Sequence, residues 1–399
     1  MLFRILIPLL ILLSLPIWSV DRLTLRGRLK GWRRIAFYLP NTAIIIAVVI
    51  TALTESYSAS ADRWKALLLT ITFCICIPQT VTALLTLLYL PLRRWSAKVA
   101  NWGGIMALTA GLATLCLLVY GFTMGFRQIV VDRFDFHSPD IPERFDNYRI
   151  VQVSDLHLGT LHGRESVVQS IVDSINSLNA DLVVFTGDLV NYHSEEAAEF
   201  LPLLKQIKGK DGVISIMGNH DYAQYYRWPS PADSLADIHK LQALERAAGW
   251  NLLLNENEII RREGDSIAIV GVENQGKPPF PALANLPKAQ SGLSEGCFRV
   301  LLSHDPTHWH SGVLRKTDIP LMLSGHTHGM QFKIGAFSPA SWFYPEWGGP
   351  YRSGSQTLYV SLGVGEVMLP FRLGAWPEIN LITLKRASRG HFAEEISTH

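Results

Sequence analysis

The sequence predicts an α/β domain that follows an N-terminal anchor of four membrane-spanning helices. Two observations support this fold class. The first third of the 399 residues contains four long apolar stretches, whereas the remainder has an ordinary globular composition. In that remainder, short continuous apolar runs alternate with segments of helical spacing, which is typical of a largely covered sheet. We therefore expect an anchor at residues 1–126, a linker at 127–147 and an α/β domain at 148–399.

The apolar stretches of the anchor lie at about Ile5–Val20, Ile35–Leu53, Ala66–Leu90 and Gly103–Phe122. Each is close to the ~20 residues that a spanning helix needs. The first stretch could instead be a cleaved signal peptide, but the residues around Val20 lack a small-x-small cleavage pattern. The sequence therefore favours four spans that all remain in the protein.

Basic residues are unevenly distributed among the loops of the anchor. The loop after the first stretch and the loop after the third are basic, whereas the segment from Glu55 to Arg63 is nearly neutral. The basic residues are Arg22, Arg26, Arg28, Lys30, Arg33 and Arg34 in the first loop and Arg93, Arg94 and Lys98 in the third. Basic loops stay in the cytoplasm, so four spans put both termini and the α/β domain outside. We expect a multi-pass protein of the cytoplasmic (inner) membrane with an extracytoplasmic domain.

Composition excludes some classes of partner. The net charge is only +2, so no nucleic acid is expected, and no protein partner is predicted. The four cysteines are too few for a disulfide framework, and three of them lie within apolar stretches of the anchor. The lipid bilayer is the one partner that the composition indicates.

The α/β domain is predicted from alternating strands and helices. The expected strands are Tyr148–Val153, Asp181–Thr186, Val213–Met217, Asn257–Arg262, Ser266–Val272, Phe298–Ser303, Pro320–Ser324, Leu358–Ser361 and Ile379–Leu384. The expected helices are Glu165–Leu178, Glu195–Ile207 and Asp233–Ala248.

Five short polar motifs follow predicted strands. They are Asp155-Leu156-His157, Gly187-Asp188, Gly218-Asn219-His220-Asp221, Ser303-His304-Asp305 and Gly325-His326-Thr327-His328. Each delivers a carboxylate, amide or imidazole one to three residues past the carboxyl end of a strand, which is the edge where open α/β sheets bind ligands. Such a donor set suits hard or borderline divalent metals better than a thiolate site would. The motifs together therefore predict a metal site.

In this order the motifs resemble those of the calcineurin-like metallophosphoesterase superfamily, and the resemblance covers roughly Tyr148 to Leu384. The resemblance is strongest to the membrane-anchored or exported, YkuE-type subgroup. It is carried by the sequences around His304 and His326 and by the C-terminal segment that begins at Tyr359. The resemblance implies an α/β sandwich with a dinuclear metal centre. Met330 departs from the subgroup, which usually has a second glycine at this position.

The resemblance also implies roles for individual residues. Asp155, His157 and His328 would hold one divalent ion, and Asn219, His304 and His326 would hold the other. Asp188 would bridge the two ions, and His220 would donate to the phosphate or the leaving group. A shared carboxylate lowers the repulsion between two cations, which together clamp phosphoryl oxygens and activate a water. The ions could be Mn, Fe, Zn or Mg, because such ligand shells accept all four.

Several neighbouring side chains have two interpretations. Asp221 could orient the imidazole of His220 or cap the segment that follows it. His162 and His193 could reach the phosphate or lie on exposed loops. The aromatic residues between Phe332 and Tyr351 could form a small core of their own or a platform at the membrane interface, where amphipathic aromatic rings are favoured.

The leading functional hypothesis is a metal-dependent phosphoesterase. It would hydrolyse a phosphoester or pyrophosphate bond of a lipid-linked substrate outside the cytoplasm, using a hydroxide that bridges the metals. A second hypothesis is a cytosol-facing pyrophosphatase of the UDP-diacylglucosamine type, which requires the opposite orientation. A third is a membrane sensor that has kept the fold and lost catalysis.

Overall fold

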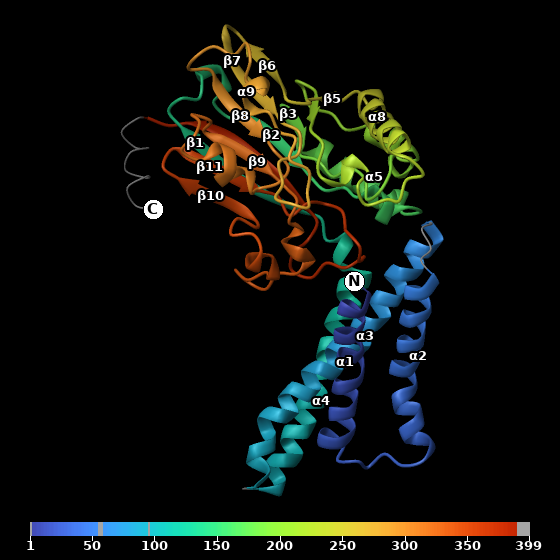
Figure 1. The fold of residues 1–399 in the computed structure, drawn as a ribbon. Helices are drawn as coiled ribbons and strands as arrows, with labels where there is room; N and C mark the ends of the chain where they lie inside the picture. The colour runs from blue at the N-terminus through green and yellow to red at the C-terminus, as the bar shows by residue number, and fades with distance from the viewer. Residues whose placement is uncertain (1, 55–58, 95, 389–399) are drawn as a thin grey trace. The chain divides into compact units, whose positions relative to one another are not determined.

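The computed structural model describes residues 2–54, 59–94 and 96–388. The chain forms two compact units (Figure 1). The first contains residues 1–124 together with residues 368–373, and the second contains residues 125–367 and 374–399.

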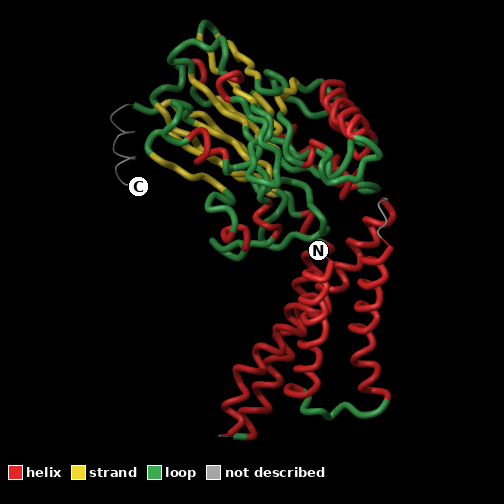
Figure 2. Tube along the Cα trace, viewed as in Figure 1, coloured by secondary structure: helices red, strands yellow, loops and turns green. Residues whose placement is uncertain are grey.

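The first unit is helical (Figure 2). Its long helices are α1 (Leu2–Ser19), α2 (Trp32–Thr54), α3 (Ala59–Tyr89) and α4 (Ala97–Thr123). Among the described residues, three segments are long and apolar enough to cross a membrane: Trp32–Thr51, Trp64–Leu92 and Asn101–Thr123.

The prediction of four spans is therefore wrong in number. The first predicted stretch forms α1, which ends after 18 residues. At about 1.5 Å per residue this helix is roughly 27 Å long, shorter than the ~30 Å hydrocarbon layer. The chain then enters a π-helical turn, Val20–Thr24, which buries the carboxylate of Asp21 against Arg34 at 2.9 Å.

Polar contacts and turns organise this helical unit. The Asn41 side chain of α2 donates to the Leu13 carbonyl of α1 at 2.8 Å and to the Gln79 side chain of α3 at 2.9 Å. The connection from α1 to α2 and the turn from α3 to α4 lie at the same end of the unit (Figure 1). The nine basic residues that the sequence analysis assigns to the first and third loops lie in or next to these connections, so these nine charges are gathered at one end.

The second unit is a sandwich of two mixed sheets within the described part of the chain. The first sheet has the order β1-β12-β2-β3-β4-β5, and its strands are Val130–Ser138, Glu378–Arg386, Tyr148–Val153, Leu182–Phe185, Val213–Ser215 and Asn251–Leu252. The second has the order β10-β11-β9-β8-β7-β6, and its strands are Gly349–Ser353, Gln356–Val360, Leu321–Ser324, Phe298–Leu302, Asp265–Gly271 and Glu256–Arg262. The predicted α/β class is confirmed.

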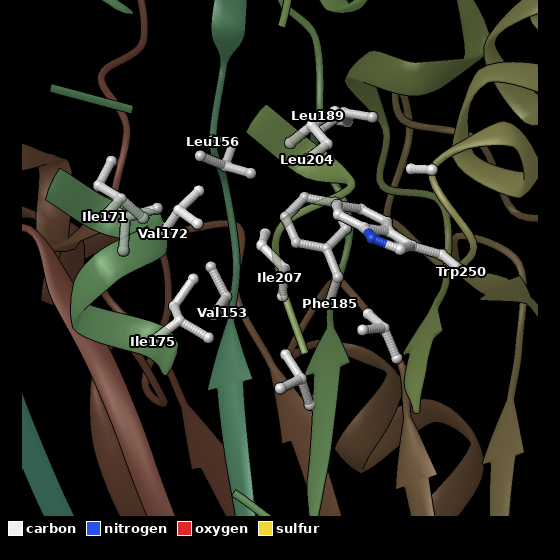
Figure 3. Close-up of a cluster of buried hydrophobic side chains, with 14 of the residues drawn as sticks. Val153, Leu156, Ile171, Val172, Ile175, Phe185, Leu189, Leu204, Ile207 and Trp250 are labelled. Atoms are coloured by element: carbon white, nitrogen blue, oxygen red, sulfur yellow. The ribbon is translucent and has the colours of Figure 1, made fainter. Parts of the chain in front are cut away.

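The core lies between the sheets and on their outer faces. Along β2, Ile150 packs into the cluster shared by both sheets, while its neighbour Val151 packs on the outer face, as strand alternation requires. The helices of this unit are α5 (Glu165–Ser177), α6 (Glu195–Ala198), α7 (Leu201–Leu204), α8 (Pro231–Ala247) and α9 (Leu286–Ala289). Figure 3 shows part of the outer core of the first sheet, where Phe185 lies 5.3 Å from Trp250 between ring centroids.

Two expected elements differ from the observed ones. The predicted linker contains β1, which pairs in parallel with β12 from Val130↔Glu378 to Ser138↔Arg386. The strand was not predicted from the sequence because its residues are largely exposed and several are charged, although Phe136 is buried between the sheets. The single helix expected at 195–207 is split into α6 and α7, because Pro202 in the first turn of α7 has no N–H to continue a helix.

Candidate metal centre

The five polar motifs lie at the carboxyl ends of adjacent strands. Asp155 follows β2, Asp188 follows β3 and Asn219 follows β4, three parallel neighbours in the first sheet. His304 and His326 follow β8 and β9, which are parallel neighbours in the second sheet. Hydrogen bonds join the two sets: the N–H of His326 donates to both carboxylate oxygens of Asp155 at 3.1 Å. Both sheets therefore contribute to one site.

The backbone at these strand ends is strained. Asp155, His157, Asp188, His326 and His328 all have positive φ, between 46° and 77°. This left-handed conformation is unfavourable for residues with a Cβ and is concentrated at functional sites in proteins. Here it occurs in the segments that follow β2, β3 and β9, where the candidate ligand side chains converge.

One group of candidate ligands consists of Asp155, His157 and His328. Their ligand atoms all lie within 4.8 Å of one another, and all three residues are buried. His157 Nε2 lies 3.0 Å from His328 Nε2, which in turn lies 3.3 Å from Asp155 Oδ1. Two imidazole nitrogens that face each other beside a carboxylate have the arrangement expected around a cation.

A second group consists of Asp188, His304 and His326, again with ligand atoms within 4.8 Å. The amide oxygen of Asn219 lies 2.7 Å from His326 Nδ1 and 3.2 Å from His304 Nε2. His304 Nδ1 is directed to the Thr186 carbonyl at 2.7 Å, which leaves its Nε2 for the centre. Oxygen and nitrogen donors are thus gathered here without any thiolate.

Asp188 lies between the two groups. Its Oδ2 is 3.1 Å from His304 Nε2 in the second group and 3.6 Å from His157 Nε2 in the first. Its Oδ1 accepts the backbone N–H of His220 at 2.8 Å, which fixes the carboxylate. The donor set and its burial therefore fit two divalent ions that share this carboxylate.

The carboxyl groups of the centre are held ionised. Burial alone would raise the pKa of Asp155, but His328 beside it lowers that pKa below its usual range. Burial would likewise raise the pKa of Asp188, but His304 lowers it well below its usual range. Both side chains therefore carry the negative charge that a cation requires.

The imidazoles differ in charge. Burial, followed by the effect of His220, holds the pKa of His157 well below its usual range, and burial also lowers the pKa of His326. Burial would lower the pKa of His304 as well, but the adjacent Asp188 raises it to about 10. Two rings are therefore neutral, while His304 forms an ion pair with Asp188 and would have to lose its proton to coordinate a metal.

His220 borders the centre and has a fixed orientation. Its Nδ1 donates to the Asn191 carbonyl at 2.8 Å, so Nε2 is the ring nitrogen that this contact does not engage. The ring stacks on Tyr225 at 4.3 Å between centroids and meets His157 edge-on at 4.8 Å. These contacts hold the ring at the border of the centre, and His220 belongs to neither ligand group.

Asp221 orients backbone rather than the His220 ring. Its buried carboxylate accepts N–H groups of Asp188, Leu189, Val190 and Gly218 at 2.8–3.2 Å. Neither of the two roles expected from the sequence matches this arrangement. Burial together with the charge of Asp188 raises the pKa of Asp221 to about 7.

The other histidines near the motifs have partners of their own. His162 is exposed and lies 2.8 Å from Glu199, and His193 packs edge-on against Tyr226. His308 is buried and pairs with the Ser303 hydroxyl at 2.9 Å. The structure gives these side chains local structural contacts.

Sequence reasoning missed two tyrosines at the centre. The Tyr225 hydroxyl accepts from Asn219 Nδ2 at 2.9 Å, and the Tyr344 hydroxyl lies 2.8 Å from His326 Nε2. Nδ1 of His326 faces the Asn219 amide oxygen, and the contact between Nε2 and Tyr344 holds the ring at its other nitrogen. A signal was present only for Tyr344, which belongs to the aromatic segment after the last motif.

The fold and the cluster of carboxylates and imidazoles are typical of a metallohydrolase, and comparisons with known proteins agree with this class. A family model described as calcineurin-like phosphoesterase matches residues 148–330. The chain is 33% identical over 295 residues to a protein of Bacillus subtilis (strain 168) named uncharacterized metallophosphoesterase YkuE, which covers 70% of this chain and 92% of that protein. The chain belongs to the calcineurin-like metallophosphoesterase family and is a hydrolase acting on phosphoester bonds.

Two further similarities are more distant. The chain is 30% identical over 297 residues to a Danio rerio protein named transmembrane protein with metallophosphoesterase domain, covering 72% of this chain and 65% of that protein, slightly less than two thirds of its length. Phosphopantetheinyl hydrolase (PptH) from Mycobacterium tuberculosis has a TM-score of 0.39 and 14% identity, over 60% of this chain and 96% of that chain. This last likeness supports no further conclusion.

Proposed function

We propose that this chain is a membrane-anchored phosphoesterase that uses two divalent metal ions to hydrolyse a phosphoester or pyrophosphate bond of a lipid-linked substrate outside the cytoplasm. The observation that carries the proposal is the position of Asp188, whose Oδ2 lies within 3.6 Å of an imidazole nitrogen in each ligand group. A carboxylate in this position is what two neighbouring cations require.

In the proposed site, Asp155, His157 and His328 would hold one ion, Asn219, His304 and His326 would hold the other, and Asp188 would be shared by both. When bound, the pair supplies an activated water and positive charge for the phosphoryl oxygens. The protein contributes a buried, preorganised frame, because the second carboxylate oxygen of Asp188 is already engaged by the His220 N–H.

His220 is proposed to act on the substrate. Its Nδ1–H is committed to the Asn191 carbonyl and its ring is stacked on Tyr225, so the ring cannot turn without losing both contacts. Nε2 is then positioned to donate a proton to the leaving oxygen or a hydrogen bond to a phosphoryl oxygen.

The proposed side of the membrane follows from the basic residues. The connection before α2 and the turn before α4 are basic, so both are assigned to the cytoplasm. The α4 helix then leads out of the cytoplasm into the second unit. This assignment does not depend on whether α1 spans the membrane. The membrane crossings are counted from the basic connection that follows α1, and that connection is assigned to the cytoplasm in either case.

Activity with defined metals tests the reaction. The full chain, purified in detergent and loaded with Mn²⁺, is expected to hydrolyse an aryl phosphodiester or monoester, and Asp188→Ala and His220→Ala are expected to abolish this. Asp173→Asn, an exposed carboxylate on α5, is the matched control that retains activity. Activity that persists after complete metal removal would refute the proposal.

Orientation and substrate need separate experiments. Alkaline phosphatase fused after His399 is active only when exported, so activity supports the extracytoplasmic site, and inactivity supports the cytosol-facing pyrophosphatase. A panel of phosphatidyl, polyprenyl-pyrophosphate and nucleotide-lipid substrates then identifies which type of phosphate bond the protein hydrolyses. Preference for water-soluble esters over every lipid in the panel would contradict a lipid-linked substrate.

A further inference from the structure

The segment after the last metal-binding motif exposes an unusual set of apolar side chains. Ile334, Phe337, Trp342 and Phe343 are all exposed, Trp342 and Phe343 to 72% and 66%. They form one surface, which we call the apolar patch. Ile334 and Phe337 exchange backbone hydrogen bonds at 2.9 and 3.0 Å, and the rings of Phe337 and Trp342 are 5.9 Å apart. Large exposed aromatic groups that cluster in this way mark interaction sites.

The apolar patch is part of an ordered segment. Ser338 is fully buried and donates to the Gly329 carbonyl at 2.6 Å, and Ala340 is also fully buried. The segment therefore buries a serine and an alanine while it exposes a tryptophan and a phenylalanine. This reverses the usual burial order of these residue types, so transfer of the exposed rings to an apolar phase would be favourable.

We infer that the apolar patch docks into the surface of the bilayer that holds the helices of the same chain, and that it thereby sets the metal centre at the level of the lipid headgroups. This inference rests on the proposed function and extends it. Aromatic rings of this kind are favoured at the interface between headgroups and acyl chains, where their apolar bodies leave water.

The length of the connecting chain supports the bilayer as the occupant. The α4 helix ends at Thr123 and β1 begins at Val130, so residues 124–129 are the connection. Even fully extended, a connection of this length reaches only about 20 Å. A bilayer is thus always within reach of the domain, whereas a second copy of the chain must first be encountered.

A second covalent connection begins beside the apolar patch. Gln331 Oε1 accepts the N–H of Val367 at 2.7 Å, and the Lys333 carbonyl lies so close to Gly374 that no Cβ fits there. Val367 and Gly374 flank residues 368–373, which group with the membrane helices. The start of the patch segment is therefore held by the chain that leads to and from those helices.

The charge of the segment agrees with a lipid surface. Between residues 330 and 343, Lys333 is the only ionisable side chain, so no carboxylate would repel anionic headgroups. The patch also connects to the metal centre: Tyr344 follows Phe343 directly, and its hydroxyl lies 2.8 Å from His326 Nε2. A headgroup beside the patch would therefore lie near a candidate metal ligand.

Depth measurements on the full chain in nanodiscs of phosphatidylcholine and phosphatidylglycerol test the inference. The four cysteines are first replaced by alanine, and a nitroxide is attached at Phe343→Cys, at Ile334→Cys or, as a control, at the exposed Leu235→Cys on α8. At residues 343 and 334 we expect high accessibility to oxygen and low accessibility to an aqueous nickel complex, and the reverse at residue 235.

Three outcomes overturn the inference or its basis. Labels at 343 and 334 that are as accessible to nickel as the label at 235 would refute docking. Labels shielded from both reagents, with spin–spin broadening between chains, would assign the apolar patch to a second copy and also refute docking. Wild-type protein that hydrolyses neither a soluble nor a membrane-bound aryl phosphate would refute the proposed function, while the depth data still decide the docking.

A kinetic comparison gives an independent readout. Trp342→Ser/Phe343→Ser is expected to raise KM for a long-chain alkyl aryl phosphate in vesicles about tenfold or more, because interfacial binding scales with buried apolar area. The same variant should hydrolyse a water-soluble aryl phosphate like the wild type, and Leu235→Ser should leave both reactions unchanged. An unchanged KM for the vesicle-bound ester would contradict the inference.

Discussion

Oδ2 of Asp221 accepts the backbone N–H of Asp188, the proposed bridging ligand, at 2.8 Å. The same Oδ2 accepts the N–H of Gly218 at 2.8 Å, and Oδ1 accepts from Leu189 at 2.9 Å. One buried side chain therefore ties together two of the strand-end turns that carry candidate ligands. The positions of Asp188 and Asn219 depend on it.

Replacing this carboxylate is predicted to weaken the metal centre. In Asp221→Asn one oxygen becomes an NH₂ group, which faces backbone N–H donors and cannot accept from them. We expect metal affinity or activity to fall by about 10- to 100-fold, as for other groups that orient metal ligands. Metal content by elemental analysis and turnover of an aryl phosphate measure the two effects. Asp173→Asn on the exposed face of α5 is the control, and equal behaviour of both variants would contradict the role of Asp221.

His220→Gln is predicted to lower turnover while the metals stay bound. The side chain borders the centre, but its Nδ1 is engaged by Asn191 and it belongs to neither ligand group. Loss of a positioned proton donor lowers kcat by about 10²- to 10⁴-fold. Metal content and kcat, measured on the same preparation, distinguish this from loss of a ligand.

The matched control for this prediction is His162→Gln, because His162 is an exposed histidine paired with Glu199. It should leave both kcat and metal content unchanged. If His220→Gln loses a metal equivalent, His220 acts as a ligand and the assignment is wrong.

Much of the fold could be predicted because the spacing of apolar residues along the sequence indicates which side chains are buried. Both ends of the β2 strand, Tyr148–Val153, were predicted correctly. Its residues are buried and uncharged except for Arg149, the second residue, which is partly exposed. The β1 strand was missed because three of its nine residues are charged, and only its pairing with β12 makes it a strand. Edge strands of this kind depend on tertiary context that no local pattern contains.

Less of the site could be predicted than its residue types suggest. The carboxyl ends of strands identified Asp155 and Asp188 as neighbours in one sheet, and His304 and His326 as neighbours in the other, because adjacent parallel strands end at one edge. The sequence placed all five motifs at a single edge and did not show that two sheets contribute to the site. Nothing local indicated that Asp221 would bind backbone N–H groups or that Tyr225 would stack on His220. Those contacts depend on the path of loops, which periodicity does not describe.

Met330→Gly is predicted to stabilise the turn that carries His328. Residues 328–331 all have positive φ, and Met330 holds 46° although its side chain is half exposed. A residue with a Cβ loses about 1–2 kcal/mol in this conformation, whereas glycine does not. Part of this gain is offset by the larger conformational entropy of glycine in the unfolded chain, so we expect about 1 kcal/mol and a Tm increase of about 2–4 °C.

Thermal unfolding in detergent measures this change. Met330→Ala is the control, since it removes the long side chain but keeps the Cβ and therefore the strain. A rise in Tm for the alanine variant equal to that for glycine would show that the exposed side chain, and not the backbone, is responsible.

Metal binding is predicted to release at least one proton at pH 7. Without metal, the Asp188 carboxylate raises the pKa of His304 to about 10, so this ring is protonated at neutral pH and must lose its proton to coordinate. The lowered pKa values of Asp155 and Asp188 mean that these carboxyls are already ionised and release none. Apparent affinity should therefore rise with pH, by about tenfold per unit for each proton released, up to about pH 10. Calorimetric titration with Mn²⁺ in two buffers of different ionisation enthalpy counts the protons, and a count of zero would show that His304 is neutral before the metal binds.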